Sequence, residues 1–166
     1  NISTKLVLIF HNNPLALGGS KTVDDRNQLL EKCEKLVFVS NWVMEKFFEG
    51  LDRKSNTKCI VIYPSIKPIN KFPNKKNIIS FVGKLNRSKG FHLFGNVIVK
   101  ILNKYKNWSG IIVGDEPREK YNFKHKNLKY MGWISHEKTL NLYSQTSISV
   151  APSFWDEPFG RTSMEA

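Results

Sequence analysis

The 166-residue sequence is poor in cysteine, in arginine and in long apolar runs. Its two cysteines, Cys33 and Cys59, have a spacing that fits neither a metal motif nor a disulfide framework, so we expect two buried, reduced thiols. The densest apolar run covers only residues 6–10, far short of the roughly 20 residues that a membrane span requires. The sequence thus gives no indication of a disulfide scaffold or a membrane-spanning helix.

The positive charge of the chain comes mainly from lysine. There are 26 basic and 14 acidic residues, a net charge of +12, and 21 of the basic residues are lysines. Such a charge suits a nucleic acid, an anionic membrane or a phosphorylated ligand. Lysine, Asn and Ile share AT-rich codons, and the chain also holds 16 Asn and 14 Ile, so genome composition explains part of the excess. Because phosphate-reading surfaces favour the bidentate arginine fork, we expect no nucleic-acid partner.

Apolar runs alternate with amphipathic segments along the chain, a pattern that predicts an α/β fold with parallel sheets and flanking helices. Strands are expected over seven segments, residues 5–10, 35–39, 59–63, 77–82, 109–113, 128–131 and 147–151. Helices are expected at 23–33, 40–48 and 89–105, after Ser135, and from about Phe159.

Two of the predicted helices have an apolar face. In helix 89–105 that face carries Phe94, Val97, Ile101 and Tyr105, and in the helix after Ser135 we expect Leu140 and Tyr143 to point inward. Residues 66–76 hold prolines, lysines and asparagines with little apolar periodicity, so they are interpreted as a linker between residues 1–65 and 77–166.

Small, polar and charged residues follow most of the predicted strands. Parallel sheets bind ligands beyond the carboxyl ends of their strands, so these positions are candidates for a site. They comprise His11, Gly83 with Lys84, Gly114 with Asp115, Gly132 with Trp133, and Pro152 with Ser153 and Glu157.

The segment 81–90 places Lys84 and Lys89 around a loop that begins at Gly83 and leads into a helix. A glycine allows close approach of a ligand, and a helix N-terminus attracts anions, so the two lysines can neutralise a diphosphate. The loop is neither a Walker A motif nor a dinucleotide-binding glycine motif. A solvated lysine-rich turn is the alternative interpretation.

The segment 157–165 places Glu157 and Glu165 eight positions apart, close to two helical turns, or ~7.2 residues. With a helix starting near Phe159, Glu157 lies in the loop and Glu165 inside the helix. Gly160 can then offer its backbone N–H to a phosphate or sugar oxygen. Alone, this pair also fits a helix cap followed by an exposed carboxylate.

Taken together, segments 81–90, 112–115, 130–134 and 150–166 resemble, in order and approximate spacing, the retaining family 4 glycosyltransferases with the GT-B fold. Segments 36–43 and 61–64 extend the resemblance over nearly the whole chain. It implies Rossmann-like parallel sheets of GT-B type, incomplete at both ends. Residues 1–65 would be the C-terminal part of the acceptor-side domain and 77–166 an incomplete donor-binding domain, so the chain is expected to be a fragment.

The resemblance also implies roles for the charged candidates. Lys84 and Lys89 would hold the donor diphosphate, Glu157 would contact the donor sugar beside the reacting centre, and Glu165 would bind the ribose hydroxyls. The family more often has arginine at the position of Lys84, so here the charge is kept but the bidentate grip is lost.

Further donor contacts are implied at strand and helix ends: Gly83, Gly114, Trp133, Ile134, Ser153, Phe159 and Gly160. Phe159 and Gly160 would present backbone N–H groups, whereas Gly114 and the backbone of Trp133 and Ile134 would border the nucleobase. His11 resembles a family histidine that faces the donor sugar from the other domain, and a turn histidine is its alternative interpretation.

The implied activity is transfer of a sugar, of hexosyl type, from a nucleotide-diphosphate sugar to a glycan or lipid-linked acceptor with retention. The sequence has no Asp-x-Asp motif, so we expect a metal-independent reaction and no cofactor besides the co-substrate. Family and charge suggest envelope polysaccharide synthesis in the cytoplasm, at the inner face of an anionic membrane. A non-catalytic nucleotide-sugar or phosphate-binding module and, less favoured, a nucleic-acid-binding protein are the alternatives.

Overall fold

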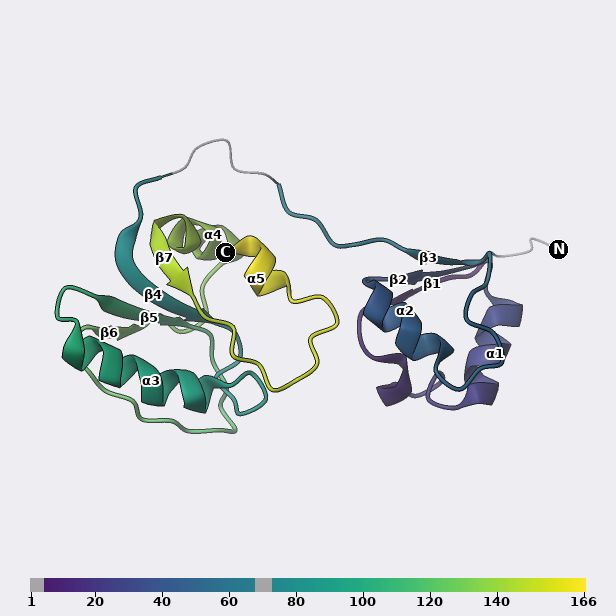
Figure 1. Cartoon of the computed structure of the whole chain (residues 1–166), viewed down its shortest axis with the longest axis horizontal. Coiled ribbons are helices and arrows are strands. Elements are labelled where there is room, and N and C mark those ends of the chain that lie inside the picture. Colours follow the sequence, from purple (N-terminus) through teal and green to yellow (C-terminus); the bar gives the residue numbers. More distant parts are fainter. Residues whose placement is uncertain (1–4, 68–72) are drawn as a thin grey trace. The chain divides into compact units, whose positions relative to one another are not determined.

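The computed structural model describes residues 5–67 and 73–166, and the chain forms two compact units, Asn1–Ser65 and Ile66–Ala166 (Figure 1). Of the predicted linker, residues 68–72 lie outside the described residues, and strand β4 already begins at Lys76. Within the described ranges, no helix is long and apolar enough to cross a membrane.

The first unit is a three-stranded parallel sheet in the order β1-β2-β3. Its elements are β1 (Val7–Phe10), a 3-10 helix η1 (Pro14–Ala16), α1 (Val23–Lys32), β2 (Lys35–Phe38), α2 (Asn41–Phe48) and β3 (Cys59–Val61). The Ser40 hydroxyl accepts the Val43 N–H at 3.2 Å, which confirms the predicted cap of α2. Phe10, Phe38 and Phe47 form the aromatic centre of its core, with ring centroids 5.2 to 5.4 Å apart.

The second unit is a four-stranded parallel sheet in the order β6-β5-β4-β7. Its elements are β4 (Lys76–Val82), α3 (Phe91–Lys104), β5 (Ser109–Val113), β6 (Leu128–Tyr130), α4 (His136–Gln145), β7 (Thr146–Ser149) and α5 (Arg161–Glu165). The predicted α/β class is therefore confirmed in both units, and strand ends differ from the predicted ones by at most two residues. Because all strands of a sheet run in one direction, their carboxyl ends meet at one edge.

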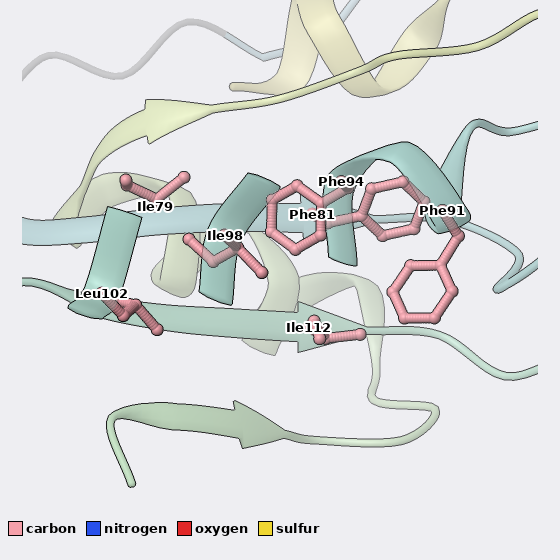
Figure 2. Close-up of a cluster of buried hydrophobic side chains, with 7 residues drawn as sticks. All are labelled: Ile79, Phe81, Phe91, Phe94, Ile98, Leu102 and Ile112. Atoms are coloured by element: carbon pink, nitrogen blue, oxygen red, sulfur yellow. The ribbon is translucent and has the colours of Figure 1, made fainter. Parts of the chain in front are cut away.

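The core of the second unit shows that the predicted apolar face of helix 89–105 was partly wrong. The buried cluster consists of Ile79, Phe81, Phe91, Phe94, Ile98, Leu102 and Ile112 (Figure 2). Val97 and Tyr105 are 44% and 48% exposed. On α3, two neighbouring stripes of apolar side chains both have helical spacing. The sheet packs against the stripe that includes Phe91, and the sequence alone does not reveal which stripe faces the sheet.

Three further expectations concern single side chains and one helix end. Tyr143 is buried as predicted, and Leu140 is half-buried. Cys33 and Cys59 are both free thiols, the first buried and the second half-buried, and burial raises the pKa of Cys59 to about 11. The last helix begins at Arg161 rather than near Phe159, since Gly160, at φ +73°, is its N-cap.

Candidate functional site

The carboxyl ends of β4, β5 and β6 are joined by backbone hydrogen bonds that glycines donate. The N–H of Gly83 donates to Val113 O at 3.0 Å, and the N–H of Gly114 donates to Gly132 O at 2.9 Å. A Cβ on Gly114 would lie 1.9 Å from Gly83 O. The close approach of two predicted site glycines, Gly83 and Gly114, therefore depends on the absence of a side chain at Gly114.

Residues 84–90, here called the lysine loop, connect β4 to α3 and carry Lys84 and Lys89. Asn86 Oδ1 accepts hydrogen bonds from the Lys89 N–H and the Ser88 hydroxyl, both at 3.0 Å. Gly90 ends the loop at φ +70° and is the N-cap of α3. An asparagine that bonds to backbone a few residues on is a common turn device, and the Asn-x-x-Lys spacing could have identified Asn86 from the sequence.

The lysine loop contacts the segment that carries Glu157. Lys89 Nζ forms an ion pair with Glu157 Oε1, and the Ser153 hydroxyl donates to the same oxygen at 2.8 Å. The Ser88 carbonyl accepts the N–H groups of Phe154 and Trp155 at 2.9 and 3.1 Å. The structure thus brings together three of the predicted site residues: Lys89, Ser153 and Glu157. Lys89 and Glu157 are about one-third exposed, so the pair is open to a ligand.

Glu116 is a carboxylate of this region that no pattern in the sequence identified as a site residue. Its side chain is buried, and both of its oxygens accept hydrogen bonds from Arg118, from Nε at 2.7 Å and from Nη2 at 2.8 Å. These bonds, with a smaller effect from the charge of Lys84, lower the pKa of Glu116 to about 2. The exposed Lys84 ammonium therefore lies in a region where a buried carboxylate stays ionised at neutral pH.

The lowered pKa of Glu116 predicts a stability change in acid. A carboxyl group with a folded-state pKa below its ordinary 4.5 stabilises the fold above that pH, and this contribution is lost as the pH falls toward about 2. We expect Glu116→Gln to unfold with a weaker dependence on pH between about 4.5 and 2 than the wild type, whereas Glu45→Gln, at an exposed position of α2, keeps the wild-type dependence. Urea unfolding at several pH values measures this, and equal slopes for wild type and Glu116→Gln would contradict it.

Glu165 lies in a second polar group. Its Oε1 accepts a hydrogen bond from Arg161 Nη2 at 3.0 Å and is 3.2 Å from His136 Nε2, and its side chain is only 8% exposed. Arg161 precedes it by one turn of α5, and His136 begins α4. In the part of the chain that the structure describes, no direct polar contact joins Glu165 to Glu157, so the two predicted glutamates belong to separate groups.

The remaining predicted residues lie at the ends of elements without forming one cluster. Trp133 is 79% exposed, and Ile134 beside it is half-buried. Phe159 is half-buried, and Gly160 caps α5. His11 is exposed directly after β1 in the first unit, so its predicted role opposite the donor sugar stays a prediction.

These features define the second unit as an α/β domain of the GT-B type, with cationic loops at the carboxyl edge of a parallel sheet. The profile of the glycosyl transferases group 1 family matches residues 63–166, more than half of the chain, and the chain belongs to that family.

Three comparisons illustrate the likeness. An uncharacterised 41.2 kDa protein in the cps region of Klebsiella pneumoniae is 29% identical over 99 residues, which are 58% of this chain and 26% of that protein. Anabaena HepE, solved with UDP-glucose, superposes with a TM-score of 0.73 at 17% identity over 98% of this chain and 50% of its own. The pneumococcal O-GlcNAc transferase GtfA, solved with UDP and GlcNAc, gives 0.65 at 13% identity over 98% and 35%. The GT-B fold predicted from the sequence is confirmed, and the chain spans half or less of these relatives.

Proposed function

We propose that the protein acts in the transfer of a sugar from a nucleoside-diphosphate sugar, and that its second unit binds the donor. The observation that carries the proposal is the contact of Lys89 with Glu157 and Ser153 at the carboxyl edge of the sheet. Membership of the glycosyl transferases group 1 family supports it. The UDP bound in the HepE and GtfA structures makes UDP the first donor nucleotide to test.

The lysines suit the chemistry of the leaving group. Breaking the bond between a sugar and a nucleoside diphosphate leaves negative charge on the diphosphate. Positive groups held in place before the reaction stabilise that charge more than a base would. We assign this role to Lys84 and Lys89, and we infer a retaining reaction in which these lysines supply the positive charge in place of a divalent metal ion.

The other predicted roles are kept as part of the proposal. Glu165, whose Oε1 lies against Arg161 and His136, is assigned to the ribose hydroxyls. Backbone groups at Phe159 and Gly160 contact the sugar or phosphate. Gly83 lines the phosphate site, whereas Gly114, Trp133 and Ile134 border the base. The first unit, joined through residues 66–76, provides the acceptor side and His11.

The acceptor is proposed from the class of relatives alone. The Klebsiella relative lies in a cps region, which favours a glycan or lipid-linked intermediate of an envelope polysaccharide as the acceptor. Such an acceptor would place the protein in the cytoplasm at the inner face of the membrane, where the net charge of +12 favours anionic lipids.

Thermal unfolding in the presence of UDP, GDP and their sugars tests the donor class. A ligand that binds only the native state stabilises it by about 2.7 kcal/mol at 100 times its Kd, so one nucleoside diphosphate should raise the Tm clearly. Glu165→Ala should weaken that binding about tenfold through the lost hydrogen bonds to ribose, whereas Ser163→Ala, an exposed residue of the same helix, should not.

Two results of this experiment would contradict the proposal. One is the absence of any shift with all of the nucleotides. The other is binding that falls steeply with salt and does not distinguish a nucleoside diphosphate from nucleic acid, which would favour a basic nucleic-acid-binding protein. Release or transfer of the sugar then separates an enzyme from a binding module.

A further inference from the structure

We propose that Glu119 is a positioning residue that holds the lysine loop in the conformation that binds the donor diphosphate. The proposal rests on the function proposed above. Glu119 lies in the connection between β5 and β6, 32 residues after Arg87 in the sequence, and belongs to none of the segments that carry the family resemblance.

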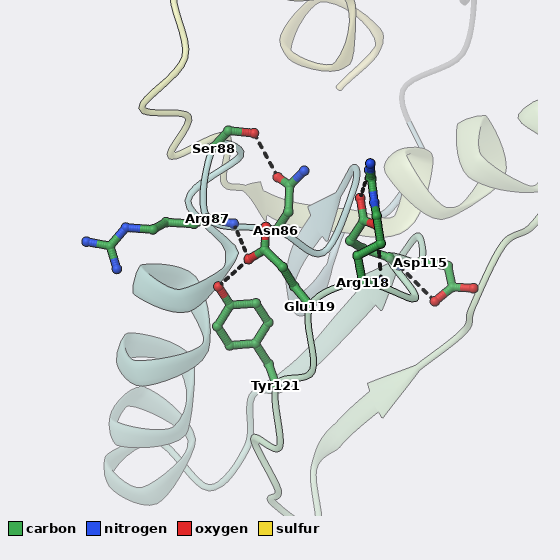
Figure 3. Close-up of polar contacts among 8 residues, drawn as sticks. Asn86, Arg87, Ser88, Asp115, Arg118, Glu119 and Tyr121 are labelled. Atoms are coloured by element: carbon green, nitrogen blue, oxygen red, sulfur yellow. Dashed lines mark hydrogen bonds and ion pairs between the residues drawn. The ribbon is translucent and has the colours of Figure 1, made fainter.

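Glu119 bonds to the middle of the loop. Its Oε2 accepts the backbone N–H of Arg87 at 2.9 Å and the hydroxyl of Tyr121 at 2.8 Å (Figure 3). Arg87 lies between Lys84 and Lys89, so the carboxylate fixes the backbone between the two lysines rather than either ammonium group. A carboxylate that accepts a backbone N–H makes a charge-assisted bond, which is stronger than a bond between neutral groups.

Tyr121 connects this carboxylate to the core of the second unit. Its ring contacts the buried Phe91 edge to face, with centroids 5.4 Å apart and an interplanar angle of 81°, and it stacks on Phe123 at 5.9 Å. Phe91 is the first residue of α3 and directly follows Gly90, the last residue of the loop. The ring of Tyr121 therefore packs where the loop joins the helix. The hydrogen bond to Glu119 raises the pKa of Tyr121 above its ordinary value, as expected for a hydroxyl that donates to a carboxylate.

The loop is held on its other side by the segment that carries Glu157. The N–H groups of Phe154 and Trp155 bond to the carbonyl of Ser88, the residue after Arg87. Two successive residues of the loop are thus fixed by two different connections of the sheet. Without Glu119, the N–H of Arg87 would lose its bond to the β5–β6 connection. The loop would then be held by the bonds to Ser88, the pair of Lys89 with Glu157 and its own internal bonds, and we expect the spacing of Lys84 and Lys89 to vary more.

Calorimetric titration of the chain with UDP, and with GDP should the nucleotide panel select it, tests the proposal. We expect Glu119→Ala to raise the Kd about tenfold, as the loss of a charge-assisted bond would. Glu119→Gln should recover most of the affinity, because an amide oxygen can accept both bonds. Tyr121→Phe should cost about threefold, since the ring remains. Glu45→Ala, at an exposed position of α2, is the matched control and should bind as the wild type does.

Amide hydrogen exchange separates positioning from a general loss of stability. Exchange at Arg87 to Gly90 should be faster in Glu119→Ala, while exchange in β4 and β5 stays as in the wild type. Wild-type affinity in Glu119→Ala would overturn the proposal, as would a Glu119→Gln variant that binds as weakly as Glu119→Ala. If Glu119→Ala does not fold, Glu119→Gln and Tyr121→Phe decide the question by the same measurements. A wild-type chain that binds no nucleoside diphosphate would instead overturn the proposed function, and this inference with it.

Discussion

Replacing Lys89 with alanine is expected to weaken UDP binding between about tenfold and 100-fold, the range for a lost hydrogen bond to a charged group. Lys89 pairs with Glu157 in the ligand-free protein, so its ammonium already lies at the carboxylate that we assign to the donor sugar. The substitution removes a positive charge and leaves the negative charge of Glu157 facing the diphosphate. Titration calorimetry measures the effect, and Lys54→Ala, at an exposed position of the first unit, is the control.

Glu157→Gln supplies the opposite test of the same contact. The ion pair competes with the diphosphate for Lys89, so removal of the carboxylate charge should tighten UDP binding by about threefold, a small gain because the pair is partly screened by solvent. Transfer of the sugar should nevertheless fall, since the carboxylate at the reacting centre is lost. If Glu157→Gln weakens UDP binding as much as Lys89→Ala does, the pair is a structural contact and the role assigned to Lys89 is wrong.

Local patterns of the sequence were sufficient for the architecture. The short apolar run 111–113, bounded by Gly110 and Gly114, is typical of a buried strand in a parallel sheet, and β5 contains it. The Ser40 cap was readable because a serine before an amphipathic segment bonds to the helix start. The buried face of α3 could not be predicted, because two adjacent apolar stripes of the helix share residues. Which stripe is buried depends on where the sheet packs against the helix.

The site was predictable only where its residues lie close in sequence or form a known pattern. Lys89, Ser153 and Glu157 were selected from the family resemblance, and the structure brings them into contact. The partners of Glu165 and of the loop backbone were not predicted. His136 lies 29 residues from Glu165, and Glu119 lies 32 residues from Arg87, and such contacts are set by how strands and loops are placed, not by local composition.

A large loss of stability is expected from Gly90→Ala. A Cβ at this position would lie 1.9 Å from Pro152 O and 2.7 Å from its carbonyl carbon, so the backbone of the loop before Glu157 would have to move. Gly90 also has φ +70°, a conformation that costs an alanine roughly 1 to 2 kcal/mol by itself. We expect the second unit to lose about 4 kcal/mol of unfolding free energy, which corresponds to a fall in Tm of roughly 16 to 30 °C for a unit of about 100 residues.

Two other glycines separate the clash from the backbone strain. Gly132 has φ +63° but no atom within 4 Å of the added Cβ, so Gly132→Ala should show the strain alone, about 1 kcal/mol. Gly18 has neither the strained conformation nor a close neighbour, and Gly18→Ala should be near neutral. Three of the four tryptophans, Trp108, Trp133 and Trp155, lie in the second unit, so their fluorescence reports its unfolding.

If Gly90→Ala is no less stable than Gly132→Ala, then the contact with Pro152 is not close in solution. The lysine loop would then not be fixed against the Glu157 segment at that point. If the expected order holds, the contact of Gly90 with Pro152 helps to hold the lysine loop against the Glu157 segment.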